Sequence, residues 1–256
     1  MRQEDRLGVI LQELNQHGSV GVTTLAERLN VSEASVRRDL HLLEQQKLLT
    51  RTHGGAVASG VLYELPMRYR GGQNYEAKRS IAQCVAALLP ADVSSIGLNG
   101  GSTTTEVARA VATRPGLRVV TNALNIASEL AVRSNIELVV CGGSARAESY
   151  ELVGPLAELV LANLNLDIAV IGVDGVSPTA GFTTHHEVEA HTNRALVRAA
   201  DRVVVAADSS KLGKRGFARI CEISAASDIV TDSGADDRAV ADLERLGPRV
   251  HVVEVG

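Results

Sequence analysis

The chain has 256 residues, a formal net charge of −4, and 45% hydrophobic against 22% charged residues. This balance is typical of a globular protein and argues against a disordered chain, and the length allows one or two domains. Four Tyr, two Phe and no Trp are too few aromatic side chains for a surface that stacks the bases of single-stranded nucleic acid or the rings of sugars.

The cysteines and the apolar segments indicate the cellular compartment of the protein. Cys84, Cys141 and Cys221 are far apart and form no C-x-x-C pair, which predicts buried apolar side chains rather than disulfides or a cysteine zinc site. The first residues lack a basic segment followed by an apolar one, and no apolar run reaches the roughly 18 residues of a membrane helix. We therefore expect a cytoplasmic protein with no membrane partner.

We expect two domains, 1–58 and 78–256, joined by a connecting segment, 59–77, that contains Pro66 and Gly71-Gly72. The first domain has helical periodicity, whereas the second alternates short Val, Ile and Leu runs with helical stretches, which is typical of parallel β-α units. The predicted fold is therefore α/β, with a small N-terminal domain and a larger domain built on a mostly parallel sheet. Seven basic and seven acidic residues balance within residues 1–60, so charge alone does not predict DNA binding.

The first domain begins with two predicted helices. The apolar residues Leu7, Ile10, Leu11 and Leu14 recur at helical spacing and stop before Gly18. A second, short helix is expected to begin at Thr24, whose side chain would form a capping box with Glu27, and to end near Asn30.

The third predicted helix, capped by Ser32 and running to about Gln46, has two contrasting faces. Val36, Leu40 and Leu43 fall on one side and predict a buried stripe. The opposite side carries Ala34, Arg37, Arg38 and His41. Arginine binds phosphate, or binds guanine through its planar fork, so this side suits entry into the major groove. The alternative is that the arginine pair only forms a solvated face.

The segment that follows, residues 48–58, predicts a β-hairpin with a turn around Gly54-Gly55. A hairpin after a helix-turn-helix is a wing, and its Arg51 and His53 could contact the DNA backbone or the minor groove. The combination of helix spacing and hairpin favours a winged helix-turn-helix domain over a merely solvated face.

Residues 6–57 resemble the DNA-binding domain of the DeoR family of bacterial transcription regulators. The resemblance rests on the stretches 25-LAERLNVSEASVRRDLHLLE-44 and 51-RTHGGAV-57. It implies a partner, double-stranded operator DNA, bound by Ser32, Ser35, Arg37, Arg38, His41, Arg51 and His53. We expect Asp39 to position Arg37, Arg38 or a neighbouring backbone group, and the sequence does not decide among these.

The second domain is predicted to alternate helices and strands. The predicted helices are 78–89, 103–113, 123–133 and 187–200. The predicted strands are 93–98, 117–121, 136–141, 167–172, 202–207, 228–231 and 249–254. Sheets of this kind bind ligands at the carboxyl ends of their strands.

Polar clusters follow five of these strands. In the first, 99-NGGSTTTE-106, glycine amides, hydroxyls and a helix N-terminus form a possible phosphate cradle, although neither a Walker loop nor G-x-G-x-x-G is present. An ordinary helix cap is the alternative. The other clusters are Thr121-Asn122, Gly142-Gly143, 172-GVDG-175 and 208-DSSK-211. Their equivalent positions predict one polar crevice, in which Lys211 is either a charge for phosphate or a solvated side chain.

These loops resemble the effector domain of the DeoR family, which is related in fold to ribose-5-phosphate isomerase and glucosamine-6-phosphate deaminase. The matching stretches include 121-TNA-123, 153-VGP-155 and 207-ADSSKLG-213. The resemblance implies a phosphorylated sugar effector bound by Asn99, Gly101, Ser102, Thr103, Thr104, Thr121, Asn122, Gly142, Gly143, Asp174, Glu187 and Lys211. Many members of the family have Asp where Asn99 stands, so this chain keeps the hydrogen bonding there but loses a charge.

One further motif, 185-HHEVEAH-191, nearly matches the zinc-binding pattern H-E-x-x-H. Position 190 is Ala, however, and histidines five residues apart do not share a helix face. We expect no metal site and no cofactor. Glu187 is expected to begin a helix, because a negative charge at a helix N-terminus interacts favourably with the helix dipole.

The sequence thus predicts a DNA-binding transcriptional regulator, most simply a repressor of sugar metabolism genes, controlled by a phosphorylated sugar. A homodimer or homotetramer is expected, because one short helix reads too few bases and symmetric operators match symmetric proteins. The alternative is a sugar-phosphate isomerase or deaminase-like enzyme with Asp174, Glu187 or Asp208 as general base, against which the wing argues. A DNA-packaging protein conflicts with the acidic second domain.

Overall fold

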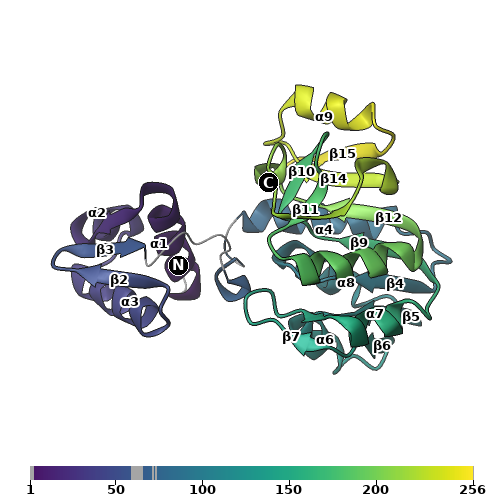
Figure 1. Cartoon of the computed structure of the whole chain (residues 1–256), viewed down its shortest axis with the longest axis horizontal. Coiled ribbons are helices and arrows are strands. Elements are labelled where there is room, and N and C mark those ends of the chain that lie inside the picture. The colour runs from purple at the N-terminus through teal and green to yellow at the C-terminus, as the bar shows by residue number, and fades with distance from the viewer. Residues whose placement is uncertain (1–2, 59–65, 71, 73, 256) are drawn as a thin grey trace. The chain divides into compact units, whose positions relative to one another are not determined.

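The computed structural model describes residues 3–58, 66–70, 72 and 74–255. The chain divides into two compact units, Met1–Gln73 and Asn74–Gly256, and each is described by itself (Figure 1).

The first unit has the predicted helices and hairpin, together with one additional strand. Its elements are α1 (Gln3–His17), β1 (Ser19–Gly21), α2 (Val22–Leu29), α3 (Glu33–Gln45), β2 (Leu49–Thr52) and β3 (Gly55–Ala58). The strands form an antiparallel sheet in the order β1-β3-β2. A Cβ on Gly55 would lie 1.8 Å from the carbonyl oxygen of Val20, so the approach of β1 to the hairpin requires glycine there.

The start of α2 differs from the prediction. The helix begins at Val22, directly after β1, because the Val22 N–H is bonded to the carbonyl of Gly54 at 2.8 Å and joins the helix to the hairpin turn. Thr24 therefore lies inside the first turn, and the predicted capping box with Glu27 is wrong, since no side chain caps this helix. The cap of α3 is as predicted, with the Ser32 hydroxyl accepting from the Ser35 N–H.

The predicted connecting segment, 59–77, contains parts of both units. Residues 59–65 lie outside the described residues. Met67–Tyr69 form one turn of 3₁₀ helix, and Tyr69 is buried in the core of the first unit against α1. The second unit begins with α4 (Tyr75–Leu88), so the structural division falls after Gln73.

The second unit is built on a seven-stranded, entirely parallel sheet, and each strand overlaps one predicted from the sequence. In sheet order, the strands are β15 (Arg249–Val253), β14 (Asp228–Asp232), β12 (Ala200–Ala206), β9 (Leu166–Ile171), β4 (Ser95–Leu98), β5 (Leu117–Thr121) and β6 (Ile136–Val140). The predicted fold class, a winged helix-turn-helix followed by an α/β domain, is confirmed.

Helices cover both faces of this sheet (Figure 1). The first face is covered by α4, α5 (Ser102–Val111) and α6 (Leu124–Leu130), and the second by α7 (Pro155–Leu161), α8 (Glu187–Arg198) and α9 (Asp237–Glu244). Successive strand residues alternate between the two cores: Val170 and Val204 pack on the first side, Ile171 and Val205 on the second. Burial of both faces explains why the strands are continuous apolar runs.

Smaller elements at the carboxyl ends of the strands were not predicted. A short hairpin, β7 (Ser144–Ala145) with β8 (Leu152–Val153), follows β6, and an antiparallel sheet combines β10 (Gly175–Ser177), β11 (Gly181–Thr184) and β13 (Ala218–Cys221). A 3₁₀ turn, Ser209–Lys211, follows β12 at this edge. A second 3₁₀ turn, Ile223–Ala225, precedes β14 and therefore lies toward the opposite edge. The hairpin, the antiparallel sheet and the first of these turns lie around the edge at which the polar clusters were expected.

Two further observations concern the expectations about cysteines and membranes. Cys141 is buried, Cys84 and Cys221 are half-buried, and all three are free thiols. Burial raises the pKa of Cys141 and that of Cys221 to about 11. Among the described residues, no helix combines the length and the apolar character that a bilayer crossing requires.

Candidate functional site

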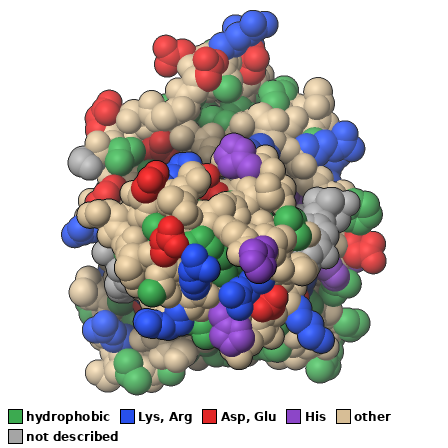
Figure 2. All heavy atoms as spheres, turned by 90° about the vertical axis from the view of Figure 1, so that its left-hand side faces the viewer, with side chains coloured by type: hydrophobic (Ala, Val, Ile, Leu, Met, Phe, Trp, Pro, Cys, Tyr) green, Lys and Arg blue, Asp and Glu red, His purple; other side chains and the backbone are tan. Residues whose placement is uncertain are grey.

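The exposed face of α3 carries the residues that the sequence analysis assigned to DNA. Arg37, Arg38 and His41 are exposed, whereas Val36 and Leu40 on the opposite side are at most 1% exposed. In the view of Figure 2, basic and histidine side chains gather over part of the surface, with acidic side chains among them. The predicted amphipathic character of this helix is confirmed.

The two arginines of this face differ in their partners. Arg37 forms an ion pair with Glu33, one turn earlier, at 2.9 Å. Arg38 has no hydrogen bond or ion pair to any residue that the structure describes. His41 lies 3.2 Å from the Gln45 amide and 3.9 Å from Glu44. Among the described residues, therefore, no carboxylate neutralises Arg38.

Asp39 does not position either arginine, so that hypothesis is wrong. Its side chain is 1% exposed and turns toward α1, where it accepts two hydrogen bonds from Arg6, at 2.5 and 3.0 Å, and one from Gln3. The Asp39 hydrogen bonds raise the pKa of Arg6, although burial opposes this shift. The carboxylate therefore fixes α3 to α1 through Arg6 and Gln3, two partners that no local sequence pattern indicates.

The wing residues lie beside the end of α3. The Arg51 N–H donates to Glu44 at 3.1 Å, and the guanidinium of Arg51 lies 3.8 Å from the same carboxylate. His53 is exposed in the hairpin turn. At the other end of α3, the Ser32 and Ser35 hydroxyls are 3.0 Å apart. All seven residues predicted to bind DNA thus lie at least partly at the surface of the first unit.

In the second unit, Asn99 joins two of the strand-end loops. Its amide donates to the carbonyl of Gly172 at 3.0 Å and accepts from the Gly172 N–H at 2.8 Å, which links the end of β4 to the end of β9. A carboxylate could accept but could not donate, so this reciprocal pair explains why Asn suits the position. Asn99 is 1% exposed, and both its hydrogen-bonding groups are used within the protein.

The N-terminus of α5 follows this loop. The hydroxyls of Thr104 and Thr105 donate to the carbonyl of Gly101, and Thr103 is buried. Gly101 has a φ of +147° and provides no side-chain cap. Ser102 alone among these hydroxyl residues is not buried. The loop therefore presents Ser102 and the first amides of an uncapped helix.

Thr121, Asn122 and Gly143 join neighbouring parts of the same edge. Thr121 donates to the carbonyl of Leu98 at 2.8 Å, and Asn122 donates to the carbonyl of Leu152 at 3.1 Å. Gly143, with a φ of +138°, lies against the β8 backbone, while Gly142 is exposed. These residues connect the strand ends to the hairpin β7–β8.

The fourth and fifth clusters meet through charged side chains. The Lys211 ammonium lies 3.8 Å from Asp174. The Thr184 hydroxyl lies 3.0 Å from both Asp174 and Glu189, and Glu189 pairs with Arg146 at 3.1 Å. The five loops thus converge on one edge of the sheet. Glu187 is exposed at the start of α8 and is not part of this network.

Two buried acids of this edge were not assigned to the effector site by the sequence analysis. Asp208 accepts from Asn74 at 3.0 Å and from Ser210. Burial would raise its pKa, but Ser210, Lys211 and Lys78 hold it below its ordinary value. Glu151 accepts from the Gly100 N–H at 2.6 Å. Burial raises the pKa of Glu151 well above its usual value, and Glu189 and Asp174 raise it further.

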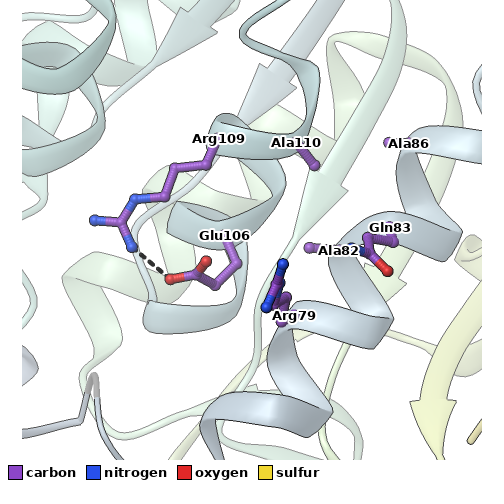
Figure 3. Close-up of a pocket in the computed structure, with 7 residues that line it drawn as sticks. All are labelled: Arg79, Ala82, Gln83, Ala86, Glu106, Arg109 and Ala110. Carbon is purple, nitrogen blue, oxygen red and sulfur yellow. Dashed lines mark hydrogen bonds and ion pairs between the residues drawn. The ribbon is translucent and has the colours of Figure 1, made fainter. Parts of the chain in front are cut away.

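Two pockets lie away from this edge. The first, of about 380 Å³, lies between α4 and α5 and contains the Arg109–Glu106 ion pair together with Arg79 (Figure 3). The second, of about 520 Å³, lies between α7 and α8. Neither contains a residue that the sequence analysis assigned to the effector.

His186 and His191 are exposed, and no group of metal-ligating side chains occurs within the described part of the chain.

The surface helix with its wing, followed by an α/β unit with a polar strand-end edge, defines a DNA-binding transcription regulator with a sensor domain. Residues 6–59 match the family model for the DeoR-like helix-turn-helix domain, and residues 73–233 match that for the DeoR C terminal sensor domain. The chain belongs to the DeoR family, so it is a transcription regulator and not an enzyme.

Curated relatives match along nearly the whole chain. The HTH-type transcriptional regulator GlpR of Haloferax volcanii is 34% identical over 98% of both chains. The glycerol-3-phosphate regulon repressor of Escherichia coli is 30% identical over 91% of this chain and 92% of its own. The L-fucose operon activator of Haemophilus influenzae is 32% identical over 93% of this chain and 94% of its own.

Among solved structures, the ribose 5-phosphate isomerase A of Methanocaldococcus jannaschii is 21% identical, with a TM-score of 0.39, over 54% of this chain and 55% of its own. The family assignment rests on the sequence relatives and not on this similarity.

Proposed function

We propose that this protein is a cytoplasmic repressor of genes for sugar metabolism that binds operator DNA through α3 and the wing and responds to a phosphorylated sugar. The observation that carries the proposal is the convergence of five polar strand-end loops in the same chain as an exposed, arginine-bearing recognition helix. The relatives named as regulators of glycerol 3-phosphate and fucose genes support the metabolite class.

In this proposal, Arg38 contacts a base edge or phosphate, and Arg37, His41 and Ser35 make neighbouring contacts with the DNA. Arg51 and His53 of the wing contact the backbone, and Ser32 contributes at the start of α3. Phosphate contacts fix the register on the duplex, whereas base contacts specify the sequence. The free guanidinium of Arg38 supports its central role, because it has no ion pair to give up on binding among the described residues.

The phosphate of the effector would bind at the N-terminus of α5, near Gly101 and Ser102, with Lys211 as a point charge. A helix N-terminus that lacks a side-chain cap offers N–H donors and a favourable dipole to an anion. Asn99, Thr103, Thr104, Thr121, Asn122, Gly142, Gly143 and Asp174 would hold the loops in place or contact the sugar. Glu187 would act only at the margin of the site, because it is exposed and lies outside the network.

Regulation requires that the effector favour one state of the protein, because a ligand with equal affinity for both states shifts nothing. We propose that the sugar phosphate favours a state of low operator affinity. One relative is named an activator, so the sign of the response is a property of each regulator rather than of the fold. A homodimer or homotetramer would provide the two recognition helices that a symmetric operator needs.

The test is a mobility-shift titration at low salt with operator-containing DNA and a panel of sugar phosphates. We expect retarded DNA, released by one member of the panel, and a sedimentation coefficient of a dimer or tetramer. Absence of any DNA binding at low salt would end the proposal.

A further inference from the structure

Several buried polar atoms at the strand-end edge have no hydrogen-bond partner within the described residues. They include Oε2 of Glu151, both amide atoms of Asn193 and Oδ1 of Asn122. These residues come from three elements, since Glu151 precedes β8, Asn193 lies on α8 and Asn122 follows β5. Such atoms are rare in native proteins, and their concentration in one place requires a reason.

Glu151 and Asn193 face each other. Glu151 is fully buried and Asn193 is 1% exposed. The Asn193 amide lies close enough to favour the charged form of Glu151, although no hydrogen bond of normal geometry joins the two side chains. The other oxygen of Glu151 is bonded to the N–H of Gly100, in the loop that precedes α5. The pair is therefore adjacent to the loop to which we assign the phosphate.

The side-chain groups of Asn193 and Glu151 that lack hydrogen-bond partners are suited to bind a hydroxyl group. Asn193 offers two N–H donors and an acceptor oxygen, and Glu151 offers an acceptor oxygen. A hydroxyl group both donates and accepts, so a single one can bridge the two side chains. An unbonded buried amide is unfavourable for folding, and a site that keeps one gains selectivity for the ligand that satisfies it.

We propose that Glu151 and Asn193 form the part of the effector site that recognises the hydroxyl groups of a polyhydroxy phosphate. The inference rests on the proposed function, because it takes the phosphate to lie at the neighbouring α5 terminus. Both side chains are closed to solvent, so the hairpin β7–β8, next to which Glu151 lies, moves when the ligand enters. Neither residue was assigned to the site from the sequence.

The decisive variant is Asn193→Leu, which has nearly the same size and removes the amide. If Asn193 had only a structural role without partners, this change would keep or raise the melting temperature and leave ligand binding unchanged. Our proposal predicts the same stability but at least a tenfold loss of affinity for the polyhydroxy phosphate. Asn163→Leu, an exposed position after α7, is the matched control and should bind as the wild type does.

The probes are glycerol 3-phosphate, ribose 5-phosphate and glucose 6-phosphate, with propyl phosphate and inorganic phosphate as anions without hydroxyls, measured by calorimetry on the full chain. The affinity for inorganic phosphate should not change in Asn193→Leu. Glu151→Gln keeps the acceptor for Gly100 but replaces the second oxygen with an amide nitrogen, which cannot accept a hydrogen bond from the ligand, so it should reduce the discrimination of glycerol 3-phosphate from propyl phosphate about tenfold.

Wild-type affinity of Asn193→Leu for the hydroxylated probes would overturn the inference, as would unfolding of this variant, because that would give the amide a structural role. Unchanged discrimination in Glu151→Gln would remove Glu151 from the site. If none of the phosphates bound the wild-type protein, the proposed function itself would fail.

Discussion

Arg38 is the residue on which the proposed reading of operator bases depends most. The neighbouring Arg37 is held by Glu33, and the structure pairs Arg38 with no described residue. Truncation of Arg38 should therefore reveal its full contribution to the complex, because it breaks no bond to a residue that the structure describes.

We predict that Arg38→Ala lowers operator affinity by about 1–3 kcal/mol if Arg38 reads a base, and relaxes specificity at one position of the operator. Fluorescence anisotropy with a set of single-base operator variants measures both effects. Arg245→Ala, at an exposed site of the second unit, controls for the loss of one positive charge. Equal operator affinity of Arg38→Ala and wild type would exclude a base contact.

Asn99 shows how a single amide can distinguish this chain from relatives with a carboxylate. In Asn99→Asp, the carbonyl of Gly172 loses its donor and faces a buried negative charge. We expect the variant to lose about 1–3 kcal/mol of unfolding free energy, the penalty for an unsatisfied buried polar group. Urea unfolding measures the loss, with Asn165→Asp as the same exchange at an exposed position. A variant as stable as wild type would mean that the loops tolerate a carboxylate here.

At the scale of elements, the orientation of the recognition helix depends on the buried contact between α1 and α3. The Asp39 carboxylate is the centre of this contact, and Arg6 is 14% exposed. Removal of one partner of a buried ion pair leaves the other charge uncompensated.

Asp39→Ala should destabilise the first unit by about 3 kcal/mol and weaken operator binding, although Asp39 does not face the DNA. Glu33→Gln breaks the solvent-exposed pair with Arg37 and should change stability far less than Asp39→Ala does. Thermal unfolding of both variants compares the two pairs. Similar losses in both would show that the buried pair has no special role.

A second element contact predicts a pH effect. Asp228 of β14 accepts from Arg202 of β12 and from His251 of β15, at 2.6 and 2.8 Å. Burial would raise its pKa, but His251 and Arg202 lower it overall. A lowered folded-state pKa gives stability that is present above the unfolded value of about 3.9 and is lost as pH falls through the folded value.

Asp228→Asn should therefore be less stable than wild type at neutral pH, and the difference should shrink below about pH 4. Urea unfolding midpoints between pH 3 and pH 7 measure it, and Asp242→Asn, which removes a partly exposed carboxylate that pairs with Arg245, is the control. A difference that stays constant over this range would contradict the assignment.

Elements with strong local patterns were predictable from the sequence. The buried strands of the sheet are continuous apolar runs, and α3 has both a side-chain cap and an apolar stripe. The short pieces β7, β8 and β10 escaped prediction because their pairing depends on contacts with distant strand ends. Long-range partners such as Arg6 for Asp39, or Gly100 for Glu151, leave no signal in a single sequence, because each depends on how two elements meet.

For the site, the sequence placed the five loops at one edge because parallel strands end together. It did not distinguish the residues that stay accessible from those that hold the loops. Thr104, Thr105 and Thr121 are bonded to backbone carbonyls, while Ser102 remains at the surface. Only packing separates these roles, since the same hydroxyl group serves both.

At the scale of the whole molecule, the account requires that two sites in one chain influence each other. By thermodynamic linkage, a sugar phosphate that weakens operator binding by some factor must itself be bound more weakly, by the same factor, when operator DNA is present. This reciprocity does not depend on which conformations are involved.

The most direct test is calorimetric titration of the protein with the sugar phosphate that releases DNA, with and without saturating operator. The account predicts a dissociation constant that rises in the presence of operator by the factor by which the sugar phosphate weakens operator binding, about 5- to 150-fold. Equal constants with and without DNA would contradict the claim that this protein couples a metabolite to a promoter.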